Sequence, residues 1–385
     1  MNTVSDTIEK TKDVHEVVNS EKDKLKNKIP LKGMTLDELR EYFIKTGEHR
    51  FRGEQVFKWM YSDLVVNYDE MLNIPKSLRS RLNNETILTT LKTTDTEQSS
   101  STGTKKFIFE TEERNKIESV IIPEKSRLAQ DGQTRNRTTL CISTQVGCPL
   151  DCKFCATGLM GYKKNLTPGE IFDQYLLAAR DYGKEKLTNI VYMGMGEPLL
   201  NFNATVKTLK IFAEELTTGV SLKKITVSTA GIAPKIKELA DSGMKVKLAF
   251  SLHSCFEDTR NKIMPINKKY SLKENIEALK YYYRKTNTRI TFEYVMLKNV
   301  NDRDEDINAL AKLCSQMPSK INIIPFNSLQ HMNPSGYAAE LTPTPKHRIE
   351  EFAQRLREKN ITVMVRNTQG DDISAACGQL AVKFK

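Results

Sequence analysis

The chain has 385 residues, of which 59 are basic and 48 acidic, and its net charge is +11. A hydrophobic content of 39% is enough to build a core, which excludes a disordered chain, and no apolar run approaches the roughly 20 residues of a membrane-spanning helix. Residues 1–155 hold 25 basic and 24 acidic side chains, whereas residues 156–385 hold 34 and 24. A basic half of this kind favours a nucleic-acid partner, although scattered surface lysines would give the same total.

The N-terminal third divides into segments of different composition. Residues 1–32 are polar, which predicts a flexible extension, and they lack the apolar core of a secretory signal, which predicts a cytoplasmic protein. Residues 33–93 carry apolar side chains at helical spacing and predict a small helical domain. Residues 94–137 predict a linker and a β-rich connector, in which 94–104 form a polar turn or linker and 125–136 a polar loop.

Between residues 138 and 365, short β-branched runs alternate with helical patterns. We expect strands at 138–144, 188–193, 224–229, 245–251, 289–296 and 320–325. Thr167, Pro168 and Glu170 have the spacing of a capped helix start. The alternation predicts an α/β fold, and six parallel strands are too few for a closed eight-stranded barrel. The sequence therefore predicts a partial (β/α)6 barrel with its site at the carboxyl ends of the strands, followed by a C-terminal segment at 366–385.

Three of the seven cysteines lie close together, directly after the first of these strands. Cys148, Cys152 and Cys155 have C-x3-C-x2-C spacing, and thiolates are ligands that suit zinc or an iron–sulfur cluster. No fourth Cys or His follows nearby, and three ligands suit a four-iron cluster whose remaining iron binds another molecule. A zinc ion closed by a distant fourth ligand and incidental buried cysteines are the alternatives.

The cysteine motif and six further segments resemble a known family. The segments are MGMGEPLLN from Met193, STAG from Ser228, FSLH from Phe250, MPINKKY from Met264, EYVMLKNVND from Glu293 and RNTQGDDISAACGQL from Arg366. The cysteine spacing resembles the radical S-adenosylmethionine superfamily. Together, the segments resemble its RlmN/Cfr family of RNA methyltransferases over roughly residues 35–382.

The resemblance implies a role for each matched residue. Cys148, Cys152 and Cys155 would hold a [4Fe-4S] cluster. The residues that would contact S-adenosylmethionine are Gly196, Glu197, Ser228, Ser251, Leu252, His253 and Asn327. The catalytic residues would be Cys377 as methyl acceptor, Cys141 as the thiol that closes a disulfide bond with it, and Glu118 as proton acceptor. Without the resemblance, His253, Cys141 and Glu118 would each be interpreted as structural or solvated.

The activity implied by the resemblance is methylation of C2 of an adenosine in the peptidyl transferase centre of 23S rRNA and of the adenosine 3′ to the anticodon in some tRNAs. Carbon C2 is electron-poor and cannot attack a sulfonium methyl group, whereas a thiolate can, which gives Cys377 its purpose. Two molecules of S-adenosylmethionine would be used per turnover, and the chain would act as a monomer away from membranes. An electron donor such as flavodoxin or ferredoxin would reduce the cluster.

Two alternatives remain open, together with one question about the basic surface. The first alternative is methylation of adenine C8, as in the antibiotic-resistance branch of the same family. The second is a non-catalytic RNA-binding protein with a structural metal. The densest group of basic side chains would contact RNA phosphates or form a solvated helix flank, and consists of Arg260, Lys262, Lys268, Lys269 and Lys273.

Overall fold

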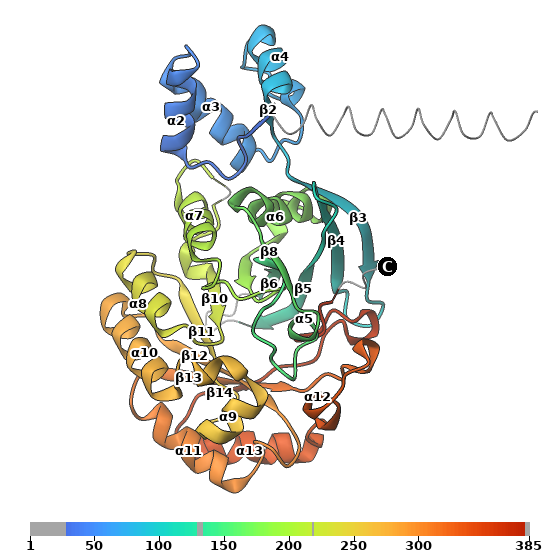
Figure 1. Ribbon diagram of the computed structural model, residues 1–385, viewed down its shortest axis with the longest axis vertical. Coiled ribbons are helices and arrows are strands. Elements are labelled where there is room, and N and C mark those ends of the chain that lie inside the picture. Colours follow the sequence, from blue (N-terminus) through green and yellow to red (C-terminus); the bar gives the residue numbers. More distant parts are fainter. Residues whose placement is uncertain (1–27, 129–133, 218, 382–385) are drawn as a thin grey trace, which may run out of the picture.

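The structure is a computed structural model that describes residues 28–128, 134–217 and 219–381. Its main sheet has ten strands in the order β14-β13-β12-β11-β10-β9-β6-β5-β4-β3. The strands β14, β13, β12, β11, β10, β9 and β6 of this sheet run parallel, and β5, β4 and β3 continue it antiparallel along the β6 edge. Figure 1 shows α2–α4 at one end of the molecule, beyond α6 and α7, and α8–α13 around the other end.

The parallel strands confirm the predicted partial barrel. They are β6 (Thr134–Cys141), β9 (Asn189–Tyr192), β10 (Ile225–Thr229), β11 (Lys247–Ser251), β12 (Ile290–Met296), β13 (Ser319–Pro325) and β14 (Val363–Val365). The main helices between and after them are α6 (Pro168–Tyr182), α7 (Phe202–Ala213), α8 (Ala233–Asp241), α10 (Leu272–Thr286), α11 (Asp304–Cys314) and α13 (Lys346–Glu358). All six expected strands are present, and β14 is a further one that is too short to give a sequence pattern.

The capped helix start is confirmed at α6. The Thr167 hydroxyl accepts a hydrogen bond from the Glu170 N–H at 3.2 Å, and the Glu170 carboxylate accepts one from the Thr167 N–H at 2.7 Å. These two bonds satisfy N–H groups that the helix cannot pair itself, so α6 begins at a defined residue.

Two polar segments are strands where loops were expected. Residues 94–98 belong to β3 (Leu91–Gln98), which pairs with β4 (Lys105–Thr111), so the expected linker at 94–104 was wrong over its first half. The expected loop at 125–136 was wrong where β5 (Lys116–Leu128) and β6 extend into it, and 129–133 lie outside the described residues. Backbone groups make the ladder bonds of an antiparallel pair, so a strand can carry polar, exposed side chains.

The helices expected between residues 33 and 93 are α2 (Leu36–Lys45), α3 (Arg50–Tyr61) and α4 (Lys76–Glu85). They pack directly on α6: the Tyr61 ring meets the Phe172 ring edge-on at 4.7 Å, and the Lys32 ammonium lies 3.7 Å from the Asp173 carboxylate. Leu31 and Lys32 are buried, so the predicted flexible extension does not reach residue 32, and its residues 1–27 lie outside the described part. Within the described ranges, no helix has the length and apolarity to cross a membrane.

Candidate active site

The cysteine loop lies between two short strands that pair antiparallel, β7 (Gln145–Gly147) and β8 (Tyr162–Asn165). Gly147 has a φ of +74°, and a Cβ atom there would lie 1.9 Å from the Gly161 carbonyl oxygen. Only glycine at position 147 allows the two ends of the cysteine loop to come this close, so the loop is closed at its base. The short helix α5 (Ala156–Leu159) starts directly after Cys155 and ends the loop.

The three thiols of this loop share a buried environment. Burial raises the pKa of Cys148, Cys152 and Cys155, and for Cys152 the charges of the other two raise it further. Backbone N–H groups donate to the sulfurs of Cys148 and Cys155. Cationic iron would supply the charge that buried thiolates need, so the donor set fits an iron–sulfur cluster.

In the described part of the chain, no three or more Cys, His, Asp or Glu side chains converge on a point where they could bind a single metal ion. Thiolates that each bind a different iron of a four-iron cluster do not have to converge in this way.

Glu197 lies at the carboxyl end of β9, where the backbone turns sharply at Gly196. Gly196 has a φ of +98°, and a Cβ atom there would lie 2.5 Å from the Gln145 side chain. The two oxygens of the buried Glu197 carboxylate accept hydrogen bonds from the N–H groups of Leu199 at 3.0 Å and Ala230 at 2.7 Å. Burial raises its pKa to about 7, although these bonds oppose the shift. A carboxylate so placed can receive an ammonium group from a ligand.

The neighbouring strand ends hold the other expected ligand contacts. Ser228 and Ser251 are half-buried at the carboxyl ends of β10 and β11, whereas Leu252 is fully buried. His253 follows with a φ of +56°, an unusual conformation for a residue with a side chain. Its Nδ1 accepts the Val295 N–H at 3.0 Å, and burial lowers its pKa to about 3, so the ring is neutral with its proton on Nε2.

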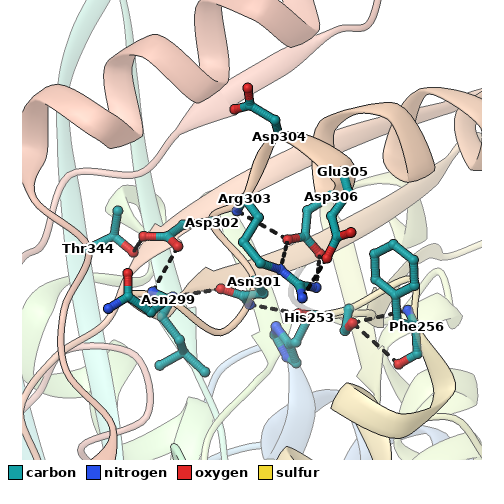
Figure 2. A network of polar contacts seen from close by, with 12 residues as sticks. His253, Phe256, Asn299, Asn301, Asp302, Arg303, Asp304, Glu305, Asp306 and Thr344 are labelled. Carbon is teal, nitrogen blue, oxygen red and sulfur yellow. Dashed lines mark hydrogen bonds and ion pairs between the residues drawn. The ribbon is translucent and has the colours of Figure 1, made fainter.

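Asn301 fixes this conformation of His253 and was not assigned a role from the sequence. Its carboxamide donates to the carbonyls of His253 and Val295, both at 2.7 Å, and accepts the Leu297 N–H at 2.7 Å. Figure 2 shows Asn301 between His253 and the turn of Asn299 and Asp302. Asn301 lies in the segment EYVMLKNVND, which was quoted above from the sequence, but only the fold shows that its carboxamide binds the backbone of His253.

Arg260 was grouped with basic side chains that were expected to contact RNA phosphates or to form a solvated helix flank, and both expectations are wrong for this residue. It lies on α9 (Glu257–Ile263) and is fully buried. Its guanidinium donates to the carbonyls of Ser251 at 2.8 Å, Leu252 at 2.6 Å and Ala230 at 2.6 Å. These carbonyls belong to the ends of β10 and β11, so Arg260 joins the two strands where the expected ligand contacts lie. Arginine suits this place because its planar fork serves several acceptors at once.

The C-terminal segment crosses the open side of this site. Its backbone is tied to the cysteine loop by the Ala156 N–H, which donates to the Gly378 carbonyl at 2.7 Å, and by the Thr157 hydroxyl, which donates to the Leu380 carbonyl at 2.6 Å. Asn327, expected to contact S-adenosylmethionine, donates to the Cys377 carbonyl at 3.0 Å. The exposed Cys377 is thereby held beside the cysteine loop.

Glu118 connects this segment to β5. Its carboxylate accepts the Ala381 N–H at 3.0 Å and lies 3.5 Å from the ammonium of Lys106. Burial raises the pKa of Glu118, and Lys106 lowers it. Lys106 also donates to the Ile373 carbonyl at 2.7 Å. Lys106 was given no role from the sequence, because there it is only one of two adjacent lysines before a β-rich run.

Cys141 and Cys377 come together around Arg366. Burial and the charge of Cys377 together raise the pKa of Cys141 to about 12, although Arg366 opposes the shift. Arg366 lies 3.5 Å from the buried carboxylate of Glu293 and acts on both thiols. All seven cysteines are within the described ranges and none forms a disulfide.

Comparison with known proteins adds the family. The model of the radical SAM superfamily matches residues 142–311, and that of the ribosomal RNA large subunit methyltransferase N-terminal domain matches residues 29–88. A probable dual-specificity RNA methyltransferase RlmN from Flavobacterium psychrophilum is 41% identical over 92% of this chain and 98% of the relative. The dual-specificity RNA methyltransferase RlmN of Alcanivorax borkumensis is 39% identical over 93% of this chain and 91% of the relative.

The chain belongs to the RlmN family. It is thus a dual-specificity radical SAM RNA methyltransferase, and neither C8 methylation nor a non-catalytic role is favoured. Its fold agrees, since the crystal structure of a radical SAM methyltransferase from Sphaerobacter thermophilus matches with a TM-score of 0.82 and 40% identity over 91% of this chain and 99% of that one.

RlmN-type enzymes, as radical SAM proteins, bind a [4Fe-4S] cluster and S-adenosylmethionine. The observations above fit both groups. The buried thiols of the cysteine loop have the chemistry of cluster ligands, and Glu197 offers a carboxylate at the adjoining strand end. The loop, the strand ends and the C-terminal segment therefore bring the residues of the candidate site together.

Proposed function

We propose that this chain methylates C2 of adenosine in 23S rRNA and in tRNA, with Cys377 carrying the methyl group. The carrying observation is the position of the C-terminal segment, which sets Cys377 beside the cysteine loop, near Cys141 and within the same contact network as Glu118. The rRNA adenosine is that of the peptidyl transferase centre, and the tRNA adenosine is the one 3′ to the anticodon. An unpaired or flipped base is required, because C2 of a stacked adenine is out of reach.

In this proposal the cluster is held by Cys148, Cys152 and Cys155, and S-adenosylmethionine lies against the strand ends. The residues that would contact it are Gly196, Glu197, Ser228, Ser251, Leu252, His253 and Asn327. When bound, S-adenosylmethionine supplies the methyl group, and the cluster together with S-adenosylmethionine supplies the one-electron chemistry that methylation of C2 requires. Two molecules of S-adenosylmethionine serve one turnover, one as methyl donor and one as radical source.

The side chains of this chain handle the thiol and proton steps. The Cys377 thiolate takes the methyl group by displacement at the sulfonium. Desolvation of its sulfur raises the pKa of Cys377, and the positive charge of Arg366 opposes that rise. The S-methyl group then loses one hydrogen atom to the radical that the second S-adenosylmethionine supplies, and its carbon bonds to C2. The adduct gives up one electron to the cluster of the cysteine loop, and the Glu118 carboxylate accepts the C2 proton. Lys106 and the Ala381 N–H orient that carboxylate and oppose the rise in its pKa that burial causes.

Release of the product falls to Cys141. Its thiolate attacks the Cys377 sulfur, the bond between that sulfur and the methylene carbon breaks, and the carbon takes up a proton to become the methyl group. The two cysteines are left as a disulfide, which an external dithiol reduces with two electrons before the next turnover. The raised pKa of Cys141 makes Arg366 important here, because only a thiolate attacks.

The test follows the covalent adduct. Cys141→Ala should accumulate a protein–RNA crosslink in RNA-containing reactions, because nothing releases the adduct, and a denaturing gel would detect it. Cys377→Ala should form none, and Cys314→Ala, which changes a thiol outside the site, should turn over normally. Mass spectrometry of the RNA then reads the modified carbon. A methyl group on C8, or a Cys141→Ala protein that carries the cluster and S-adenosylmethionine but forms no crosslink, would refute the proposal.

A further inference from the structure

A recess of about 400 Å³ opens on the surface of the cysteine loop. It is lined by the loop residues Pro149, Leu150 and Asp151 and by Pro265, Ile266, Lys268 and Lys269, which lie in and after the short helix η4 (Pro265–Lys268). We call it the lysine recess. Lys268 and Lys269 are exposed at its edge.

The floor of the lysine recess is part of the packing around the cysteines. Leu150 and Cys152 belong to one buried apolar cluster with Ile263 and Met264, and the half-buried Ile266 packs against it. The Lys153 N–H donates to the Ile263 carbonyl at 2.9 Å, which fixes the loop to this side. A molecule seated in the recess therefore touches the loop that carries the cluster ligands.

The segment that carries Cys377 contacts a different part of the loop. Its bonds go to Ala156 and Thr157 at the start of α5, and none of its residues lines the lysine recess. A partner could thus occupy the recess while the substrate base lies at Cys377.

The composition of the lysine recess fits a protein better than RNA. Prolines and aliphatic side chains form the floor, and the edge carries Lys268, Lys269 and Asp151. The Asp151 carboxylate is paired with the Lys153 ammonium, so the rim is charged with a positive excess around an apolar centre, as in a protein interface. RNA recognition uses aromatic or guanidinium faces and amide groups for the bases, and none of these is among the lining residues. Lysine rims steer acidic partners and give weak complexes that form quickly.

We propose that the lysine recess docks an acidic one-electron carrier protein, and that Lys268 and Lys269 steer it to the cluster. The inference rests on the proposed function, since each radical turnover needs an electron from outside the chain. One electron passes from the carrier, which is oxidised, to the cluster, which is reduced. No bond to the chain is formed, so a transient complex is sufficient.

The test compares two reductants on the cluster-bearing full chain. Reduced flavodoxin serves as the protein carrier, and dithionite serves as a small reductant that needs no docking surface. The variant is Lys268→Glu with Lys269→Glu. The matched control is Lys223→Glu with Lys224→Glu, an exposed adjacent pair at the amino end of β10. Stopped-flow absorbance follows cluster reduction without RNA, and gel shift measures RNA affinity separately.

We expect flavodoxin to reduce the charge-reversed variant at least about tenfold more slowly at low salt, with the difference shrinking as salt rises. For the charge-reversed variant, the rate of dithionite reduction, the iron content and the RNA affinity should stay within about twofold of those of the unchanged protein. The control variant should match the unchanged protein in all of these and in its rate of reduction by flavodoxin.

A variant with Lys268→Gln and Lys269→Gln should be reduced by flavodoxin at a rate between those of the unchanged protein and the charge-reversed variant. Equal flavodoxin rates in all variants would overturn the proposal. A loss of RNA affinity with unchanged flavodoxin rates would assign the lysines to RNA instead. Because cluster reduction is measured without methylation, failure of the C2 chemistry leaves this result readable.

Discussion

At the scale of single residues, burial decides what each charged group of the site can do. Glu197 and Arg260 are both ionisable and both lie at the carboxyl ends of the strands, within the protein. Arg260 has its donors occupied by three carbonyls and the Asn267 side chain. Glu197 receives two N–H groups and keeps acceptor capacity, since each carboxylate oxygen can take a further bond. One side chain is therefore structural and the other is free to bind a ligand.

The pKa of about 7 for Glu197 predicts a pH-dependent affinity for S-adenosylmethionine. The carboxylate must be ionised to receive the ligand's ammonium group, so affinity should rise as the pH increases through 7. Below 7, it should fall by up to about tenfold per pH unit, with one proton released on binding. Calorimetry between about pH 5.5 and 7.5 would measure both quantities. In Glu197→Gln the affinity should be weaker and flat. A pH-independent affinity of the unchanged protein would exclude this role.

Replacement of Arg260 tests its place between the strands. Arg260→Lys keeps the charge but leaves carbonyl oxygens of β10 and β11 unpaired, so we expect a loss of about 2–4 kcal/mol in the free energy of unfolding and weaker S-adenosylmethionine binding. Urea unfolding and equilibrium binding would measure these effects. Arg289→Lys is the matched control, because Arg289 binds a single carbonyl, that of Ser319, at the amino end of β13. It should leave ligand affinity unchanged.

At the scale of elements, the turn after β12 and the C-terminal segment both act as clamps. The turn begins at Leu297 and is closed by Asn301, whose carboxamide ties it to His253, just beyond the end of the neighbouring strand β11 (Figure 2). The C-terminal segment is held by Asn327, Lys106 and Glu118, which come from three other elements. Each clamp depends on side chains distant in sequence, so neither is formed until the barrel has assembled.

The clamp at the turn predicts a strong effect of Asn301→Ala. Three backbone groups would lose their partners in a buried place, and the φ of +56° at His253 would lose its support, so we expect about 2–4 kcal/mol lower unfolding free energy and at least tenfold weaker S-adenosylmethionine binding. Urea unfolding and equilibrium dialysis would show this. Thr344→Ala removes one hydrogen bond to Asp302 in the same region and should cost about 1 kcal/mol with unchanged binding. Similar binding for both variants would disprove the clamp.

At the scale of the whole molecule, the N-terminal helices and the barrel form a single packed unit. The Lys32 ammonium is fully buried between the rings of Tyr61 and Phe172, 3.7 Å from the Asp173 carboxylate. Burial lowers the pKa of Lys32 to about 8. Asp173 also accepts the N–H and hydroxyl of Thr90, so this pair connects α6 with both ends of the N-terminal domain.

Removal of one partner of this pair should loosen the domain. Lys32→Met leaves the Asp173 charge buried without compensation, and we expect about 3–5 kcal/mol lower unfolding free energy and faster amide exchange in α2–α4. Lys32→Met combined with Asp173→Leu removes both charges and should recover most of the loss. Hydrogen exchange with mass spectrometry would measure the effect. A double variant as unstable as the single one would mean that the pair itself, rather than the unpaired charge, carries the stability.

Much of the architecture could be predicted because its signals are local. The six strands are runs of β-branched residues, the capping box at Thr167 is a four-residue pattern, and the cysteine loop has a fixed spacing. The errors concern segments whose state is set by a partner. Residues 94–98 are a strand because β4 lies beside them, and Arg260 is buried because three carbonyls receive it.

The sequence by itself therefore determined most of the elements, the spacing of the three clustered thiols and the family, since these depend on residue type, period and spacing along the chain. Only the tertiary structure decided which basic residues face solvent, what holds His253, and that Glu118, Cys141 and Cys377 come together. The physical reason is that burial and hydrogen-bond partners are set by segments far apart in sequence. The basic side chains illustrate this, because Arg260 and Lys32 are buried against oxygen acceptors whereas Lys268 and Lys269 face solvent, although nothing in their residue type distinguishes these places.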